Sequence, residues 1–359
     1  MFSASQSGAL APTARQALFA RSAKSAGREG CEIRVATKDV IGDSGAAGGG
    51  LPLRGAVLIA GPTASGKSAL ALEIAQLTGG VIVNADSMQV YDVLRVLTAR
   101  PEAEDLRPAP HHLYGHVHPS VPYSTGEWTR DVERLAASGH LEGRRAIFVG
   151  GTGLYFRALL GGLSAMPDIP PAIRESWRDR LSRGGPAELH AILAKRDPQT
   201  ASGLRPTDGQ RIARALEVLD ASGRSIRHWQ TQSSAPLVDP ASATCLVIDI
   251  DRALLHRRID ERVERMVEQG AVDEVRRVRS LGLDPALPAM KAIGVPEFGA
   301  FLDGTSTLEE AVSKVQAATR QYAKRQLTWF RNQLGPEWTR HSASAPVNWG
   351  PHSQIIKLC

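Results

Sequence analysis

The chain has 359 residues, of which 42% are hydrophobic and 22% charged, a composition typical of a globular protein with room for more than one domain. It contains no run of about 18 apolar residues, and its three cysteines, Cys31, Cys245 and Cys359, form no Cys-x-x-Cys pair, so a membrane span and a disulfide scaffold are not expected. The isolated cysteines fit a reducing cytoplasm, and the net charge of +6 favours an anionic partner.

The first segment, residues 1–51, is small, polar and glycine-rich and has no sustained apolar period. Such a composition does not supply enough apolar surface to offset the entropy lost on ordering. We therefore predict a disordered N-terminal extension over 1–51, and we also assign residues 343–359 to a C-terminal tail.

Short apolar runs then alternate with helix-length segments. Buried strands are expected at 56–60, 81–83, 146–149 and 245–248. This alternation predicts an α/β fold with a parallel sheet flanked by helices, formed by residues 52–166 and 237–342. Residues 167–236 lack strand patterning, are rich in arginine and are bounded by prolines, which predicts a helical insertion domain.

A phosphate-binding motif follows the first predicted strand and precedes a predicted helix. The pattern G-x-x-x-x-G-K-[ST] is matched by Gly61, Pro62, Thr63, Ala64, Ser65, Gly66, Lys67 and Ser68. Glycines let backbone N–H groups turn toward phosphate oxygens, and the helix N-terminus adds partial positive charge. Lys67 would neutralise a terminal phosphate, and the Ser68 hydroxyl would bind Mg²⁺. The motif predicts a site for a polyphosphate.

A carboxylate, Asp86, follows the second predicted strand and should lie beside this motif, because ligands of parallel sheets bind at the carboxyl ends of strands. There it could bind Mg²⁺ through water or act as a general base. A helix N-cap explains an aspartate at this position equally well.

A glycine-rich turn follows the third predicted strand, at Gly150-Gly151-Thr152-Gly153. Glycines permit close approach of a substrate to the backbone, and the Thr152 hydroxyl could donate to it or accept from it. A tight connection between a strand and a helix is the simpler interpretation of the same residues.

Basic residues share helical faces in two predicted helices. Arg211 and Arg214 are three apart, and Arg320, Lys324 and Arg331 recur around Trp329 and Phe330. Basic and aromatic residues together suit a nucleic acid, although each run alone also fits a solvated helix face.

Two further groups of side chains receive simpler interpretations. The arginines at 257, 258, 262 and 265 avoid the apolar stripe of their helix and are consistent with a solvated face. The histidines at 111, 112, 116 and 118 are close in sequence, but no neighbouring cysteine or helical His-Glu pattern supports a zinc site.

Taken in order, these motifs closely resemble those of the tRNA dimethylallyltransferases (IPP transferases), and the likeness extends from about residue 53 to 340. It is carried by eight blocks: GPTASGKS at 61–68, NADSMQVY at 84–91, TARP at 98–101, PHHL at 110–113, VGGTGLY at 149–155, DGQRIARALEV at 208–218, MKAIGV at 290–295 and TRQYAKRQLTWFR at 319–331. The resemblance implies a P-loop NTPase-like fold with an inserted helical domain that grips tRNA.

The resemblance also implies an activity: transfer of a dimethylallyl group from dimethylallyl diphosphate to N6 of adenosine 37, beside the anticodon of tRNAs that read codons beginning with U. The phosphate motif would then hold the diphosphate leaving group with Mg²⁺. Asp86 would be the general base, and Thr63, Lys67 and Thr152 would complete the catalytic set. The enzyme is expected to be a cytoplasmic monomer.

By the same matching, several segments are expected to contact tRNA. They are Asp86, Ser87, Met88 and Gln89; Thr152; Arg174; Gln210, Arg211, Ile212, Ala213 and Arg214; and Met290, Lys291, Ala292, Ile293, Gly294 and Val295. Val295 replaces an aromatic residue that is common in the family. The chain also lacks the cysteines of the zinc finger found in eukaryotic relatives, so the bacterial type is the closer likeness.

Three other functions are compatible with parts of the sequence. A nucleotide kinase would use the phosphate motif to bind ATP. An adenylate dimethylallyltransferase would share the motif and Asp86 but should lack the insertion and the later basic blocks. A non-catalytic RNA-binding protein would need neither the motif nor Asp86.

Overall fold

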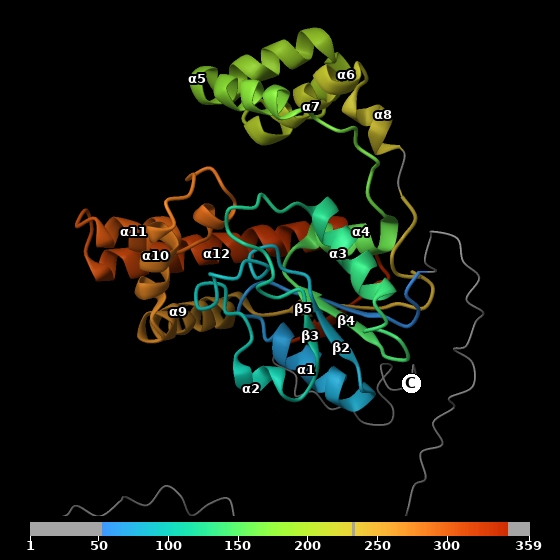
Figure 1. Cartoon of the computed structure of the whole chain (residues 1–359), viewed down its shortest axis with the longest axis vertical. Coiled ribbons are helices and arrows are strands. Elements are labelled where there is room, and N and C mark those ends of the chain that lie inside the picture. The colour runs from blue at the N-terminus through green and yellow to red at the C-terminus, as the bar shows by residue number, and fades with distance from the viewer. Residues whose placement is uncertain (1–51, 232–233, 344–359) are drawn as a thin grey trace, which may run out of the picture. The chain divides into compact units, whose positions relative to one another are not determined.

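The computed structural model describes residues 52–231 and 234–343, and in these ranges six strands form one sheet (Figure 1). Their spatial order is β3-β2-β4-β1-β5-β6, and all neighbouring pairs are parallel. The strands are β1 (Val57–Ala60), β2 (Val81–Asn84), β3 (His111–His112), β4 (Ala146–Gly150), β5 (Thr244–Asp249) and β6 (Trp338–Ser342). The predicted parallel α/β fold is confirmed.

Helices lie between these strands along the chain. They are α1 (Lys67–Thr78), α2 (Ala103–Leu106), α3 (Thr125–Ala137), α4 (Gly153–Gly161), α9 (Arg252–Glu268), α10 (Ala271–Ser280), the short 3₁₀ helix η1 (Ala289–Lys291), α11 (Val295–Leu302) and α12 (Leu308–Gln333). Capping boxes begin α3, with Ser124 and Glu127, and α12, with Thr307 and Glu310. None of the helices in the described ranges is long and apolar enough to cross a membrane.

Alternating side chains of the central strand enter different cores. From β1, Val57 and Ile59 pack with Leu70 and Ile74 of α1, whereas Leu58 packs on the other face with residues of α3 and α4. Both faces of the sheet are therefore buried, which explains why the central strands are mostly apolar; Asn84 of β2 is a buried polar exception.

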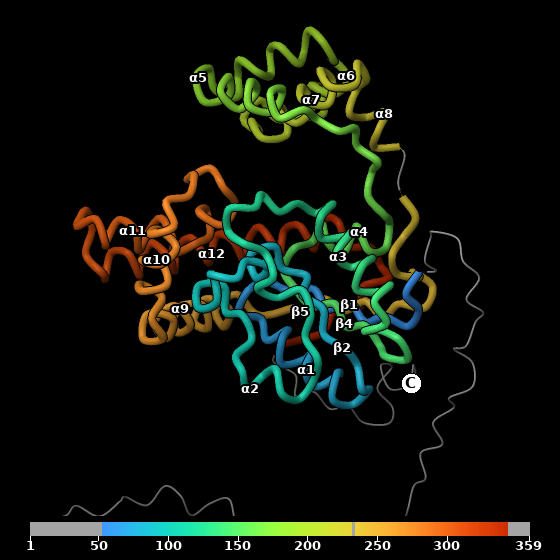
Figure 2. The backbone as a smooth tube through the Cα atoms, in the orientation of Figure 1, coloured from blue at the N-terminus to red at the C-terminus, as the bar shows by residue number. Residues whose placement is uncertain are grey.

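The sheet brings three loops to one edge. Strands β2, β4 and β1 are adjacent, with Asn84 paired to Val149 and Ala60 paired to Gly150. Because all strands are parallel, the loops after these three strands leave from the same edge. The backbone can be followed from β1 through residues 61–66 into α1 in Figure 2.

The two strands β3 and β6 were not predicted from the sequence. β3 has only two residues, both half-buried. In β6 only Trp338 is buried, and its polar neighbours Thr339 and Arg340 are exposed. Both strands lie at the edges of the sheet, where one-sided burial removes the continuous apolar run that marks a central strand.

The chain between β4 and β5 contains a helical block with its own core. Its helices are α5 (Pro171–Arg196), α6 (Pro198–Ala201), α7 (Gly209–Ser222) and α8 (Ile226–Gln230). α5 is interrupted at Gly185, where φ is +73°, followed by Pro186. Leu189 and Leu193 of α5 pack against Leu216 of α7. This block lies inside the segment for which we predict an insertion domain, 167–236.

The predicted N-terminal extension, 1–51, lies outside the described residues. Of the predicted C-terminal tail, 343–359, only Ala343 is described.

Candidate active site

The phosphate motif forms a loop between β1 and α1. Its turn depends on positive φ angles at Ala64 (+63°) and at Gly66 (+93°), the residue that begins α1. The Gly61 N–H donates to the Gly150 carbonyl at 3.3 Å, and the Ser65 N–H donates to the Pro62 carbonyl at 3.3 Å. A left-handed alanine is strained, and such strain is typical of loops whose shape serves a ligand.

Two serines of this loop have hydroxyls suited to a ligand. Ser65 is 2% exposed, and its hydroxyl lacks a hydrogen-bond partner within 52–231 and 234–343. Ser68 is exposed in the first turn of α1. A buried hydroxyl without a partner is costly, so Ser65 supports a bound polar group here. Over the described ranges no three His, Cys, Asp or Glu side chains gather to hold a metal.

Lys67 lies in the loop with its ammonium donating to the Pro62 carbonyl at 3.3 Å. The pKa of Lys67 is lowered to about 8, mainly by burial; attraction to Asp86 opposes this shift, and the positive charge of Arg262 adds to it. A bound anion would stabilise the charged form. The low pKa therefore indicates a lysine placed to neutralise a polyanion.

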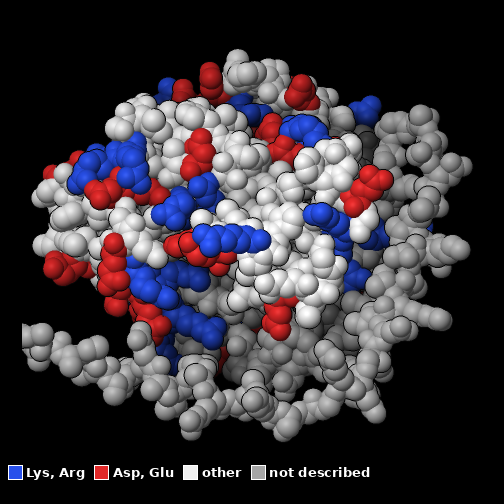
Figure 3. Space-filling view, turned by 60° about the horizontal axis from the view of Figure 1, so that its bottom comes forward, with Lys and Arg blue, Asp and Glu red and all other residues white. Residues whose placement is uncertain are grey.

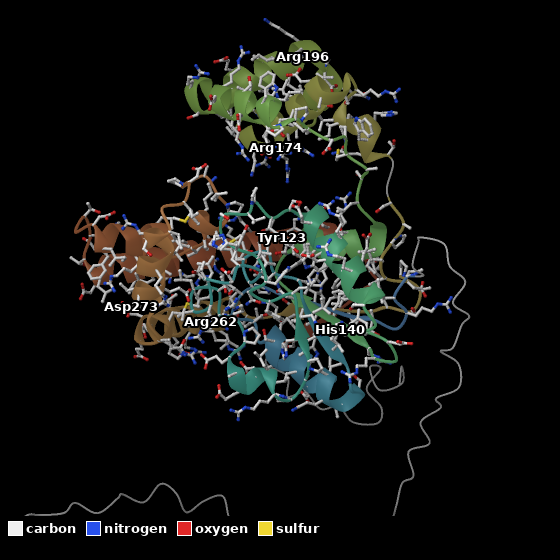
Figure 4. The ribbon with its side chains drawn as sticks, viewed as in Figure 1. Tyr123, His140, Arg174, Arg196, Arg262 and Asp273 are labelled. Carbon is white, nitrogen blue, oxygen red and sulfur yellow. The ribbon has the colours of Figure 1, made fainter. Side chains whose placement is uncertain are left out.

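Two arginines of α9 reach the same loop. Arg258 donates to the Ser65 carbonyl at 3.4 Å, and Arg262, labelled in Figure 4, donates to the Thr63 hydroxyl at 3.4 Å. Burial, followed by the charges of Arg265 and Arg258, lowers the pKa of Arg262. Neither Arg258 nor Arg262 forms an ion pair with any acidic side chain that the structure describes. The sequence had suggested that all four arginines of this helix form a solvated face. This is wrong for Arg258 and Arg262, and it holds for Arg257 and Arg265, which are exposed.

The turn after β2 is held by the buried side chain of Asn84. Its amide oxygen accepts from the Asp86 N–H at 2.8 Å, and its amide nitrogen donates to the carbonyls of Asp86 and Leu113. Asp86 Oδ1 accepts from the Met88 N–H at 2.9 Å. No helix begins here, so Asp86 is not a helix N-cap; one carboxylate oxygen fixes the turn. Oδ2 has no hydrogen-bond partner among the described residues.

Three tyrosines surround Asp86. Burial raises the pKa of Tyr114, Tyr155 and Tyr322, and in each case the negative charge of Asp86 raises it further. These hydroxyls therefore stay neutral at physiological pH. They were not predicted from the sequence, since each reads as an ordinary core aromatic.

Thr152 ties the turn after β4 to the Asp86 turn. Its hydroxyl accepts from the Ser87 N–H at 2.9 Å, and its own N–H donates to the Ala85 carbonyl at 3.2 Å. Thr152 thus holds both neighbours of Asp86 in the chain.

The glycines of this turn make room for other parts of the same chain. A Cβ at Gly150 would collide with the Ala85 carbonyl, one at Gly151 with the Gln326 amide and one at Gly153 with the Trp329 ring. Two interpretations of these glycines were open from the sequence, close approach by a substrate and a tight connection between a strand and a helix. The structure gives them partners within the protein instead.

Gln326 of α12 connects the loops after β1 and β4. Its Oε1 accepts from the Thr63 N–H at 2.9 Å, and its Nε2 donates to the Gly151 carbonyl at 3.0 Å. Sequence reasoning missed Gln326, because a single glutamine within a basic helix has no pattern that marks it as buried.

The predicted tRNA-contacting residues in the sheet domain differ in exposure. Gln89 donates to the Thr98 and Ala99 carbonyls, at 2.8 and 3.2 Å, and so holds the loop after it. In the later segment Lys291 is exposed, Met290 and Ile293 are half-buried, and Ala292, Gly294 and Val295 are buried. Val295 packs in a core cluster, so its side chain is not presented to a base.

The predicted tRNA-contacting residues of the helical block lie on α5 and α7. Arg174, labelled in Figure 4, and Gln210 are exposed. Arg211 pairs with Asp208 at 3.5 Å, and Arg214 pairs with Glu217 at 3.3 Å. Ile212 and Ala213 belong to the core of the block, so only the polar members of this segment offer side chains to a ligand.

The basic face of α12 is partly used within the protein. Arg320 pairs with Asp260, and Phe330 is buried, so Phe330 is not available to stack on a base. Lys324, Arg325 and Trp329 line an open groove. On the face shown in Figure 3, basic and acidic side chains are interspersed in small groups instead of forming one basic field.

The clustered histidines have other partners. His116 lies 2.9 Å from Asp131, which Tyr123 and Arg134 also contact, and His111 forms a hydrogen bond with the Ala109 carbonyl at 2.8 Å. These contacts account for both side chains without a metal.

Comparison with known proteins agrees with this geometry. Residues 89–333 match the model of the IPP transferase family, and residues 54–112 match that of isopentenyl transferases. The tRNA dimethylallyltransferase of Mesorhizobium japonicum is 59% identical over 300 residues, covering 84% of this chain and 93% of that protein. The enzyme of the same name from Chelativorans sp. is 60% identical over 286 residues, covering 80% and 98%.

Solved structures give the same result. The tRNA isopentenylpyrophosphate transferase of Bacillus halodurans aligns with a TM-score of 0.60 at 31% identity, covering 85% of this chain and 94% of that one. A eukaryotic dimethylallyltransferase acting on tRNA aligns with a TM-score of 0.70 at 26% identity, covering 84% and 77%. With its parallel sheet, phosphate loop and adjacent carboxylate, the chain belongs to the IPP transferase family.

Proposed function

We propose that this chain, a prenyl-transferring enzyme by its family, transfers the dimethylallyl group of dimethylallyl diphosphate to N6 of adenosine 37 in tRNA. The observation that carries the proposal is the position of Asp86. Its neighbours Ala85 and Ser87 both form hydrogen bonds with Thr152, and its charge interacts with Lys67 of the phosphate loop. A cationic site for a leaving group thus adjoins a carboxylate able to accept a proton.

The diphosphate would bind in the loop at 61–68. Lys67, Arg258 and Arg262 provide positive charge, and the backbone N–H groups at the start of α1 provide donors. As the C–O bond of the donor breaks, negative charge develops on the leaving diphosphate, and fixed cations stabilise it most at that moment. Mg²⁺, when held by Ser68 and the diphosphate, would add a Lewis acid to the same oxygens.

Asp86 would act as the general base. N6 of adenine is a weak nucleophile because its lone pair is delocalised into the ring, and loss of its proton as the C–N bond forms prevents a high-energy ammonium product. The proton would pass from N6 to Asp86 Oδ2, the oxygen that is not engaged by the turn. Thr152 would keep that turn in place.

The acceptor adenosine must leave the anticodon loop to reach this site. Unstacking a base costs a few kcal/mol, which contacts to neighbouring nucleotides offset. The segments that we assign to tRNA binding are Asp86 to Gln89, Met290 to Val295, Gln210 to Arg214 and Arg174. In the buried stretches, backbone groups and the exposed side chains, such as Lys291, would make these contacts.

The relatives favour this activity over the alternatives. Those named above are tRNA enzymes, which gives no support to a nucleotide kinase or to an enzyme acting on free adenylate. The diphosphate of the prenyl donor is therefore a better occupant of the loop than ATP. We expect the enzyme to act in the cytoplasm as a monomer.

The test is a transfer assay with dimethylallyl diphosphate, Mg²⁺ and unmodified tRNA carrying adenosines at positions 36 and 37. We expect N6-dimethylallyladenosine at position 37, detected by mass spectrometry after nuclease digestion, without added ATP. A tRNA with guanosine at position 37 is the matched control. Formation of ADP and a phosphorylated product, with no prenylated nucleoside, would disprove the proposal.

A further inference from the structure

Gln326 is a buried amide that contacts two substrate loops and is far from both in sequence. Gln326 is 5% exposed. The hydrogen bond to the Thr63 N–H spans 263 positions, and the one to the Gly151 carbonyl spans 175. Each end of the amide therefore binds a different loop, and both loops are anchored to the same helix, α12.

The two loops carry different halves of the reaction described above. Thr63 belongs to the phosphate loop, where its hydroxyl accepts from Arg262. Gly151 precedes Thr152, whose hydroxyl accepts from the Ser87 N–H next to Asp86. Three hydrogen bonds, joined by the peptide bond between Gly151 and Thr152, thus link the phosphate loop through Gln326 to the turn that carries the base.

The packing around Gln326 leaves no freedom for this amide. A Cβ at Gly151 would meet the amide nitrogen, so the glycine is required for the contact. On the same helix, Tyr322 interacts with the Gln326 side chain, and burial keeps the Tyr322 hydroxyl neutral by raising its pKa. With the amide in place, both of its polar atoms are satisfied in a water-poor position.

We propose that Gln326 is a positioning residue that sets the separation between the phosphate loop and the Asp86 turn, and hence between the carbon of the donor and N6 of the acceptor. The inference rests on the proposed function. Loss of the Gln326 contacts would let the two loops shift relative to each other. A shift of about 1 Å between reacting groups can lower the rate about 100-fold, which sets the size of the effect that we expect.

The test is single-turnover transfer by Gln326→Met with saturating donor and tRNA. Methionine matches the length and burial of glutamine but makes neither hydrogen bond. We expect a rate constant about 10- to 100-fold lower, with the full amplitude of product and less than about 3-fold change in the Kd for tRNA. Gln333→Met, at an exposed glutamine on the same helix, should match the wild type.

A purely structural role would change a different quantity. If Gln326 only stabilised the fold, the variant would show a reduced amplitude with an unchanged rate constant, and the proposal would be wrong. An unchanged rate constant at full amplitude would also overturn it. Failure of the wild-type enzyme to prenylate tRNA would instead contradict the proposed function, so the two failures are distinguishable.

Gln326→Glu supplies an independent signature. A protonated glutamic acid can accept from the Thr63 N–H and donate to the Gly151 carbonyl as the amide does, whereas its carboxylate would face that carbonyl with no proton to donate. The rate of Gln326→Glu relative to wild type should therefore rise as pH falls, and that of Gln326→Met should stay constant. If the rate of Gln326→Glu relative to wild type does not depend on pH, the two hydrogen bonds of the amide do not position the loops, and the proposal is contradicted.

Discussion

Arg262 Nη1 lies 3.4 Å from the Thr63 hydroxyl, although the two residues are 199 positions apart in the chain. The α9 helix that carries Arg262 also carries Arg258, 3.4 Å from the Ser65 carbonyl. Two cations from a late helix therefore complete a phosphate loop that is formed early in the chain. Because they form no ion pair within the described ranges, their charge is available to an anion.

Removal of this charge should weaken binding of the donor. We expect Arg262→Ala to raise the Kd for dimethylallyl diphosphate about 10- to 100-fold, because a hydrogen bond to a charged group contributes about 1.5–3 kcal/mol. The Kd for tRNA should change little. Isothermal titration calorimetry checks both, with the exposed Arg265→Ala on the same helix as control. If Arg262→Ala and Arg265→Ala lose the same affinity for dimethylallyl diphosphate, only the overall charge of the helix matters and the position of Arg262 does not.

The pKa of Lys67, about 8, predicts a pH dependence for binding of inorganic diphosphate. Lys67 is charged below this pKa and neutral above it, so its contribution to binding should be lost as pH rises through about 8. Diphosphate gains charge over the same range, and Lys67→Met serves to subtract that effect. Because bound diphosphate raises the pKa of Lys67 above about 8, the ratio of the two affinities should be constant below about pH 8 and fall toward one as pH rises above it. A constant ratio would mean that Lys67 does not titrate there.

Asp86→Asn should abolish turnover, with kcat lower by about 1000-fold or more, since a positioned base contributes about 100- to 10,000-fold. Asparagine can still accept from the Met88 N–H, so the turn and the affinity for tRNA should persist. Rapid-quench assays and filter binding measure the two quantities. The exposed Asp105→Asn is the control. Normal turnover by Asp86→Asn would exclude this residue as the base.

Two glycines at opposite ends of α4 should respond differently to alanine. At Gly153 a Cβ collides with the Trp329 ring, and overpacking of this kind costs about 1–3 kcal/mol. At Gly161 a Cβ meets no atom within 4 Å, and the gain in helix propensity stabilises by up to about 1 kcal/mol. Urea denaturation of both variants checks the opposite signs. If Gly153→Ala is as stable as the wild type, Trp329 moves freely.

Arg211 and Arg214 should contribute to tRNA binding through phosphate contacts. Their present partners are Asp208, the N-cap of α7, and the buried Glu217 on α7. The exposed pair of Arg211 is weak enough to be exchanged for a phosphate, whereas Arg214 would have to approach a phosphate while it stays paired with Glu217. The double alanine variant should weaken tRNA binding and reduce the slope of log K against log salt by about 1–2. An unchanged slope would mean that both arginines only stabilise the helical block and make no phosphate contacts.

The sequence predicts the central strands and the phosphate loop well, because continuous apolar runs and glycine spacing are local signals. Edge strands such as β6 escape prediction, since only Trp338 in it is buried. Gln326, Arg258 and Arg262 also escape, because no local pattern says which polar face of a helix meets a loop 190 or more positions away. Asp86 is predictable from its place after a strand, whereas its free oxygen depends on the fold of the turn.

The span of these contacts has a genetic consequence. All eight residues of the phosphate loop are translated by position 68, but the amide that anchors the loop is encoded at position 326. A premature stop codon upstream of Gln326 would leave the loop intact in sequence and without its partner on α12. Late nonsense alleles should therefore be null for the modification, even though every residue of the early motifs is present.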